Sequence, residues 1–276
     1  MTPEFPARLH PILARDSDDA VIFRRGPSKA VCTVHWDRRK NTFKVGQWLK
    51  GRIYERRSDL SPDGKYLIYF AMNGKWDSET GGSWTAVSRA PYLKAITLFG
   101  KGDCWHGGGL FTGGRQFWLN DGHGHSEMTR SSEVSRDGEF QPDTYYGGEC
   151  TGVYYVRLQR DGWKLKGHHG AKLDTWTVFE KELPKGWVLR KTAHEQVGAP
   201  PGKGCYWDEH ELENTQSGTK LQFEGWEWAE LDGKRIVYTA DGKLFRVSLK
   251  SQTALGVPKE LYDFNDMGFA ELTAPY

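Results

Sequence analysis

The chain has 276 residues, of which 38 are Lys or Arg and 36 are Asp or Glu, so its formal net charge is +2. This near balance excludes the basic composition that nucleic-acid binding requires, and no apolar run approaches the ~20 residues of a membrane-spanning helix. The 33 glycines, 12 Trp, 12 Tyr and 13 Phe are typical of an all-β protein, because aromatic residues favour strands and glycine favours turns.

The N-terminal residues MTPEFPARLHPILARDSDDAVIF carry proline and charge where the apolar core of a signal peptide would stand. The four cysteines are widely spaced and form no Cys-x-x-Cys pair, so the sequence predicts no disulfide framework. We therefore expect a protein of the bacterial cytoplasm, where thiols stay reduced.

Short runs of β type follow one another along the chain, separated by Gly, Asp and Asn turns. We expect strands at residues 20–24, 30–36, 42–48, 66–71, 84–88, 95–99, 116–119, 152–158, 176–180, 187–190, 221–224, 235–239, 244–249 and 268–272. Asp-Gly or Asn-Gly pairs stand at 63–64, 73–74, 161–162, 232–233 and 241–242. These pairs favour tight hairpins, because both residues tolerate positive φ.

One strand motif occurs twice. The residues Asp63-Gly64-Lys65 precede the predicted strand 66–71, and Asp232-Gly233-Lys234 precede the predicted strand 235–239, at an offset of 169 residues. This offset equals about three units of 56 residues or four of 42, near the ~40–50 residues of a four-stranded propeller blade. The repeat therefore predicts a protein built from blades.

Segment 61–69, SPDGKYLIY, resembles the WD40-like repeat of TolB-type β-propellers, in which an S-P-D-G-K turn precedes the strand nearest the channel. The clear resemblance covers about a tenth of the chain. It implies a single β-propeller domain over residues 1–276 with five or six four-stranded blades, an architecture whose radial repetition leaves only short sheet edges. A large irregular β-sandwich or barrel is the alternative fold.

Charge is divided unevenly between the ends of the chain. Residues 1–60 hold 13 basic and 7 acidic residues, whereas residues 205–276 hold 7 basic and 13 acidic residues. A closed ring of blades would place these oppositely charged ends side by side.

The region of residues 101–150 departs from the strand pattern, because it is dense in glycine and polar residues. We expect it to form long loops over one face of the propeller. Since binding and catalytic residues are found more often on loops than on the scaffold, we expect function to lie in this region.

The hypothesis that the protein is an enzyme rests on its histidine residues. His106, His123, His125 and Glu127 lie in the same Gly-rich region, and imidazole and carboxylate groups serve both as acid–base catalysts and as metal ligands. They predict, as an alternative, a hydrolase or lyase whose active site lies over the central channel. This site would either hold a metal on His106, His123 and His125 or work without a metal. Against this, Gly124 favours a loop, and the histidine spacing matches no known zinc pattern.

No complete catalytic motif or phosphate-binding loop occurs in the sequence. We therefore expect a non-catalytic binding module with no catalytic residues, no metal and no cofactor, which engages a protein partner through one rim of the propeller. The many Trp and Tyr residues favour this role, because such side chains dominate protein interfaces. The same aromatic residues could stack on a sugar ring, so a carbohydrate-binding propeller, or one that binds another small molecule, is the second alternative.

Overall fold

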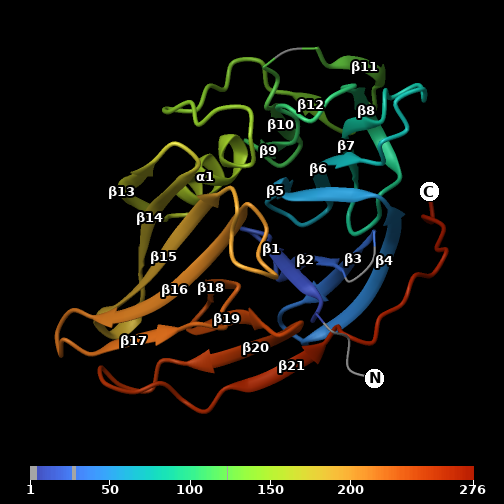
Figure 1. Ribbon diagram of the computed structural model, residues 1–276. Coiled ribbons are helices and arrows are strands. Elements are labelled where there is room, and N and C mark those ends of the chain that lie inside the picture. The colour runs from blue at the N-terminus through green and yellow to red at the C-terminus, as the bar shows by residue number, and fades with distance from the viewer. Residues whose placement is uncertain (1–4, 27–28, 123) are drawn as a thin grey trace. The chain divides into compact units, whose positions relative to one another are not determined.

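The computed structural model describes residues 5–26, 29–122 and 124–276 (Figure 1). In this part of the chain the strands form five sheets of three to five strands each. All neighbouring strands are antiparallel except one short parallel pair, and one ten-residue α-helix interrupts their succession. The prediction of an all-β fold is therefore confirmed. The number of sheets, five, agrees with the five or six blades expected from the sequence.

The chain divides into two compact units. Unit 1 comprises residues 1–9 and 162–267, and unit 2 comprises residues 10–161 and 268–276. Inside unit 1 the backbone N–H of Ala7 donates to the Asn265 Oδ1 atom at 2.9 Å, so the two segments that make up this unit are joined there.

The first sheet has the order β1-β2-β3-β4, and the second, which lies in unit 2, has the order β11-β8-β7-β6-β5. Their strands are β1 (Arg8–Leu13), β2 (Asp19–Arg25), β3 (Ala30–Asp37), β4 (Thr42–Lys50), β5 (Arg52–Leu60), β6 (Tyr66–Met72), β7 (Ser83–Arg89), β8 (Ala95–Gly100) and β11 (Ser126–Thr129). Apolar side chains from both sheets share one core, in which Phe23 of β2 packs with Leu67 and Tyr69 of β6.

A small third sheet of unit 2 has the order β12-β10-β9. It consists of β9 (Gly109–Phe111), β10 (Gln116–Leu119) and β12 (Ser135–Arg136), and β10 pairs with β12 in parallel. Phe111 and Phe117 of this sheet pack against Phe99 of β8. The Gly-rich region therefore contains short strands, and its loops are fixed to a folded core.

The predicted strand at 152–158 is wrong, because these residues belong to helix α1 (Thr151–Arg160). Val and Tyr favour strands in isolation, but tertiary packing overrides that propensity here. Residues 151–158 are all buried, so packing surrounds most of this helix. Figure 1 shows α1 beside β5 and β9.

Unit 1 holds the fourth sheet, β13-β14-β15-β16-β17, and the fifth, β18-β19-β20-β21. Their elements are β13 (Lys164–Ala171), β14 (Asp174–Glu182), the 3-10 helix η1 (Pro184–Gly186), β15 (Trp187–Gln196), β16 (Tyr206–Asn214), β17 (Lys220–Phe223), β18 (Trp228–Asp232), β19 (Arg235–Ala240), β20 (Lys243–Ser248) and β21 (Lys259–Asp263). The predicted strand at 268–272 is wrong, because these residues form no strand.

The two copies of the repeated motif occupy equivalent positions. Asp63 and Gly64 lie in the turn between β5 and β6, and Gly233 and Lys234 form the turn between β18, which ends at Asp232, and β19. Both glycines have positive φ, at 78° and 63°, which residues with a side chain rarely adopt. Each turn leads into the second strand of its sheet, so the repeat reflects the strand order.

No helix of the described residues is long and apolar enough to cross a membrane.

Candidate functional site

Three loops of unit 2 are bound to one another. They are the β6–β7 loop (73–82), the β8–β9 loop (101–108) and the segment 137–150 that precedes α1. Ser83, the residue of β7 that follows the β6–β7 loop, donates its hydroxyl to the Asp103 carbonyl at 2.6 Å, and the backbone N–H of His106 donates to the Gly148 carbonyl at 2.6 Å. The β6–β7 loop itself approaches the β8–β9 loop at Gly81, where a Cβ atom would lie 2.8 Å from the Gly102 Cα atom.

Arg57 of β5 contacts two of these loops, the β8–β9 loop and the segment 137–150. Its guanidinium is buried, and it donates to the carbonyl oxygens of Cys104 at 2.7 Å and His106 at 2.6 Å. It also forms an ion pair with Glu149 Oε2 at 3.0 Å. Gly108 allows this approach, because a Cβ atom there would lie 1.9 Å from the Arg57 carbonyl oxygen. One side chain thus fixes both loops.

His106 belongs to this loop junction. Its ring lies close to two glycines, since a Cβ atom would stand 2.0 Å from the ring on Gly122 and 2.8 Å on Gly148. Its Nε2 atom is 3.0 Å from the hydroxyl of Tyr145. Since the ring is confined on both sides, His106 holds Tyr145 in place.

His125 is held by two polar partners. Its Nδ1 atom is 2.9 Å from Asp121 Oδ1, and its Nε2 atom is 3.2 Å from Thr85 Oγ1. Burial lowers the pKa of His125 below the usual 6.5, although the hydrogen bond to Asp121 opposes the shift. The order Thr–His–Asp matches that of a catalytic triad, but Thr85 is fully buried and accepts a hydrogen bond from the Gly108 N–H. This arrangement fixes Asp121 and His125 to β7.

The predicted enzyme residues have separate partners. Glu127 lies exposed on β11 and pairs with Arg130 at 2.7 Å, whereas His106 contacts Tyr145 and His125 contacts Asp121. His123 lies outside the described residues. Among the residues that the structure describes, no group of three or more His, Cys, Asp or Glu side chains is placed to hold a metal ion.

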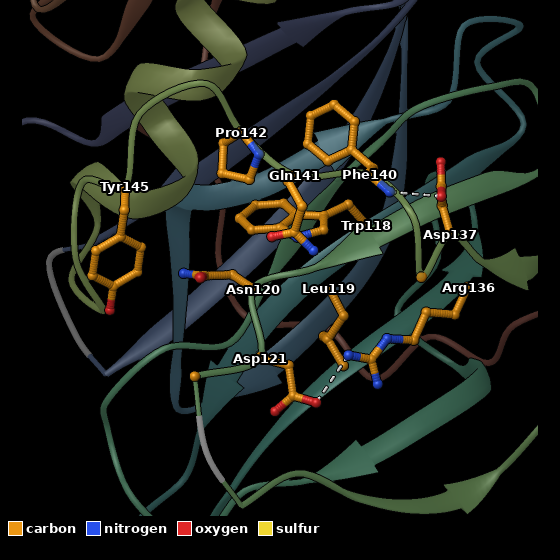
Figure 2. Close-up of a pocket in the computed structure, with 12 residues that line it drawn as sticks. Trp118, Leu119, Asn120, Asp121, Arg136, Asp137, Phe140, Gln141, Pro142 and Tyr145 are labelled. Carbon is orange, nitrogen blue, oxygen red and sulfur yellow. Dashed lines mark hydrogen bonds and ion pairs between the residues drawn. The ribbon is translucent and has the colours of Figure 1, made fainter.

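A pocket of about 230 Å³ lies beside this junction, between the end of β10 and the segment that follows β12 (Figure 2). We call it the β10 pocket. It is lined by Trp118, Leu119, Asn120, Asp121, Gly122, Arg136, Asp137, Gly138, Phe140, Gln141, Pro142 and Tyr145. The sequence predicts functional loops in this region, but it identifies none of the residues that line the pocket, because no sequence motif joins them.

The β10 pocket combines aromatic rings with paired charges. The rings of Trp118 and Phe140 meet edge to face, with centroids 5.8 Å apart. Asp121 Oδ2 lies 3.0 Å from the guanidinium of Arg136. Burial opposes the ionisation of Asp121, but its hydrogen bonds to His125 and Arg136 and their charges hold the pKa of this carboxyl below its usual value. Asp121 is therefore charged at neutral pH.

Each of the three bound loops exposes one large aromatic side chain. Trp76 on the β6–β7 loop is 57% exposed, Trp105 on the β8–β9 loop is 55% exposed, and Tyr145 before α1 is 70% exposed. We call these three side chains the aromatic loop surface. Side chains of this size are normally covered, so their exposure makes them a candidate for a binding surface.

Comparisons with known proteins were made at the level of sequence and of structure. No family model matches the chain, and no curated protein matches it. Among solved structures, cobalt-substituted Synechocystis ACO is similar at 10% identity and a TM-score of 0.17. That match covers 91% of this chain and 50% of the other, so the chain spans half the length of that protein. A likeness this weak carries no argument about function.

Proposed function

We propose that this protein is a non-catalytic binding module that engages a protein partner through the aromatic loop surface. The observation that carries this proposal is the placement of Trp76, Trp105 and Tyr145 on three adjoining loops, of which the β8–β9 loop is hydrogen-bonded to the segment 137–150 and approached by the β6–β7 loop at Gly81. Trp and Tyr are enriched among the residues that contribute most to protein–protein affinity, since each buries a large area at low cost in side-chain entropy.

The charges around the aromatic loop surface favour a basic segment of the partner. The three loops carry seven acidic residues and two lysines. Asp103 is paired with Lys101 and Glu149 with Arg57. The loops hold one other lysine, Lys75, and five other acidic residues: Asp77, Glu79, Asp137, Glu139 and Asp143. Lys or Arg side chains of a partner would lie against the aromatic rings and near these carboxylates, which stabilise cations together.

The loops are held in place before any partner binds. The buried Arg57 guanidinium joins the β8–β9 loop to Glu149, and His106 orients Tyr145. A surface that is already ordered loses less conformational entropy on binding, so more of the contact energy appears as affinity. This supports recognition by a fixed surface.

The test compares a variant of the aromatic loop surface with a matched control. Tagged wild-type protein, the triple variant W76A/W105A/Y145A and the control Leu173→Ala are used to capture partners from cells, with quantitative mass spectrometry. Leu173 is 65% exposed on the β13–β14 hairpin of unit 1, so the control removes a similarly exposed apolar side chain elsewhere.

We expect a partner that the wild type and Leu173→Ala retain and that the triple variant loses by at least about tenfold. The interaction should weaken as salt increases, because charge complementarity contributes to it. Circular dichroism checks that the triple variant is folded. Equal capture by all three proteins, or no captured protein at all, contradicts the proposal.

A further inference from the structure

Residues 268–276 of unit 2 form no helix or strand, and a few side chains hold them against the fold. We propose that they occupy a peptide-binding site, from which an extended segment of a partner protein displaces them. The ligand is a segment with a tyrosine and, seven residues before it, a phenylalanine, as Tyr276 and Phe269 stand in this chain. We call the residues that receive it the tyrosine site: Gln47, Trp48, Lys50, Arg89, Tyr92 and Lys94.

Tyr276 is the main anchor of the segment. Its hydroxyl accepts the backbone N–H of Arg89 at 3.0 Å and donates to the Lys94 carbonyl at 2.7 Å. The Arg89 guanidinium carbon and the Lys94 Nζ atom lie 4.7 and 5.4 Å from the centre of the Tyr276 ring, within the range of cation–π attraction. The ring of Tyr92 meets it at 75°, with centroids 6.1 Å apart. The site therefore selects an aromatic ring that carries a hydroxyl, which is tyrosine.

The rest of the segment lies against β4. The centroid of the Phe269 ring is 5.9 Å from that of Trp48 and 4.7 Å from the Lys50 Nζ atom. Between the two anchors, the Nε2 atom of Gln47 donates to the Leu272 carbonyl at 2.9 Å. A ligand must therefore present two rings and one free carbonyl along one extended stretch of chain.

The tyrosine site is ordered by bonds that do not involve its ligand. The Oε1 atom of Gln47 accepts the backbone N–H groups of Leu93 at 2.7 Å and Lys94 at 3.0 Å, and the Ser88 hydroxyl donates to the Tyr92 carbonyl at 2.6 Å. These bonds fix the β7–β8 turn to β4 and aim the Gln47 amide and the Lys94 carbonyl. A site that is already ordered loses less conformational entropy when it binds a ligand.

The segment itself is held much less firmly than the site. Seven of its nine residues are exposed, and within the part of the chain that the structure describes none of its backbone N–H groups donates a hydrogen bond. Stretches with little burial and few backbone hydrogen bonds open locally, at a free energy well below that of global unfolding. A ligand from another chain can therefore replace the segment while the core stays folded.

The tyrosine site and the aromatic loop surface share no residue, and their charges differ. Cations face both anchor rings of the segment, namely Lys50 at Phe269 and Arg89 and Lys94 at Tyr276. The aromatic loop surface is instead surrounded by an excess of acidic residues. The two sites therefore take different segments, and failure at one leaves the other untouched.

The test titrates the full chain with the peptide GFAELTAPY, which is residues 268–276, acetylated and amidated so that it carries no terminal charge. The variant Tyr276→Ala removes the anchor from the tethered segment and leaves the site intact. In NMR spectra of 15N-labelled protein, we expect saturable binding to this variant with a Kd of ~1 mM or below, and the largest amide shifts at Arg89 and Lys94. The wild type should bind at least about tenfold more weakly, because its tethered segment competes at a millimolar effective concentration.

No saturable binding to Tyr276→Ala up to ~10 mM peptide, or equal binding to the variant and the wild type, overturns the proposal. If circular dichroism shows that Tyr276→Ala is unfolded, Tyr276→Phe takes its place, since it keeps the ring and removes only the hydroxyl. The peptide itself should bind roughly tenfold more weakly when its tyrosine is replaced by phenylalanine. Equal affinities of these two peptides contradict the selection of tyrosine.

A second substitution in Tyr276→Ala connects the binding to the site. Lys94→Gln removes a cation that contacts the tyrosine ring and should weaken the peptide roughly three- to tenfold. Lys40→Gln is the matched control, since Lys40 is also exposed and pairs with Asp37 on another turn of unit 2, and it should leave the affinity unchanged. Equal affinities for these two variants overturn the proposal. Sedimentation of the wild type checks the source of the ligand, because a dimer that Lys94→Gln removes would assign the site to a second copy of this chain and overturn the assignment to a partner.

Discussion

At the scale of single residues, buried polar side chains of unit 2 position the loops. Arg57 donates to two loop carbonyls and pairs with Glu149, and His125 links Asp121 to Thr85. Such groups are retained in a core when they meet hydrogen-bond partners, as Arg57 does through its two terminal nitrogen atoms, and removing one partner leaves the other desolvated. Their contribution is therefore to the conformation of the binding loops.

Protonation of His125 should loosen this arrangement. Burial lowers the pKa of the folded-state ring below 6.5, so the unfolded chain takes up a proton first as the pH falls through 6.5. The folded-state pKa of Asp121 is also lowered, because the effects of His125 and Arg136 outweigh the opposing effect of burial. The stabilisation of the fold by ionised Asp121 is therefore present above the usual pKa of 3.8 and is lost as the pH falls through the lowered pKa. The free energy of unfolding should therefore fall from pH 7 to pH 5, and more steeply in still more acidic buffer.

Urea unfolding at pH 7, 6 and 5 measures this effect in the wild type and in two variants. His125→Gln should show a shallower decrease between pH 7 and pH 5, because the titrating group has been removed. His168→Gln, whose residue is exposed on β13, is the control and should retain the wild-type slope. The hypothesis fails if the slope of His125→Gln equals that of the wild type.

At the scale of elements, one ion pair fixes α1 against the sheets. Arg160 donates to both carboxylate oxygens of Asp59, at 2.5 and 2.9 Å. Asp59 on β5 is fully buried and also accepts the N–H of Phe111 on β9 at 2.7 Å. Two side chains therefore join a helix and two strands that are far apart in the sequence.

Asp59→Asn should destabilise the protein by about 3–5 kcal/mol, because it removes the fully buried counter-ion of Arg160 and leaves the guanidinium paired with Asp161 alone. Asp63→Asn is a control for the same chemical change, since Asp63 pairs with the exposed Lys65 at the surface and its loss should cost about 1 kcal/mol or less. Chemical denaturation measures both. Similar losses for the two variants would show that the Asp59–Arg160 pair does not anchor α1.

Sequence reasoning found the elements whose signals are local. The hairpin between β19 and β20 follows from Asp241 and Gly242, which both adopt positive φ, at 51° and 73°. Strand β5 was missed, because Arg57 and Asp59 are charged and their burial depends on Glu149 and Arg160, about 90–100 residues away. Pairing over such distances leaves no pattern in one sequence.

The candidate site was predictable as a region and unpredictable as a set of residues. The glycines of 101–150 indicated functional loops, and the pocket lies there. The histidine pattern pointed to catalysis, yet His106 and His125 serve as loop contacts in the fold. Trp118, Asn120 and Arg136 have no distinguishing spacing, because β10 and β12 bring them together through strand pairing.

At the scale of the whole molecule, the sheets are distributed between two compact units, each with its own buried side chains. Unit 2 contains the shared core around Phe23, Leu67 and Tyr69. In unit 1, a row of stacked rings runs from Phe223 through Trp226 and Tyr238 to Phe245, with centroids 3.8, 4.0 and 5.1 Å apart. Separate cores are the condition for separate unfolding transitions.

We therefore expect differential scanning calorimetry to resolve two transitions, which two matched core variants can assign. Leu67 on β6 of unit 2 and Leu189 on β15 of unit 1 are both fully buried. Replacing either by Ala costs about 2–5 kcal/mol through lost burial and a residual cavity. A loss of this size shifts a midpoint by several degrees. Leu67→Ala should lower one midpoint and Leu189→Ala the other, whereas a single transition lowered equally by both variants would show that the two units unfold as one cooperative body.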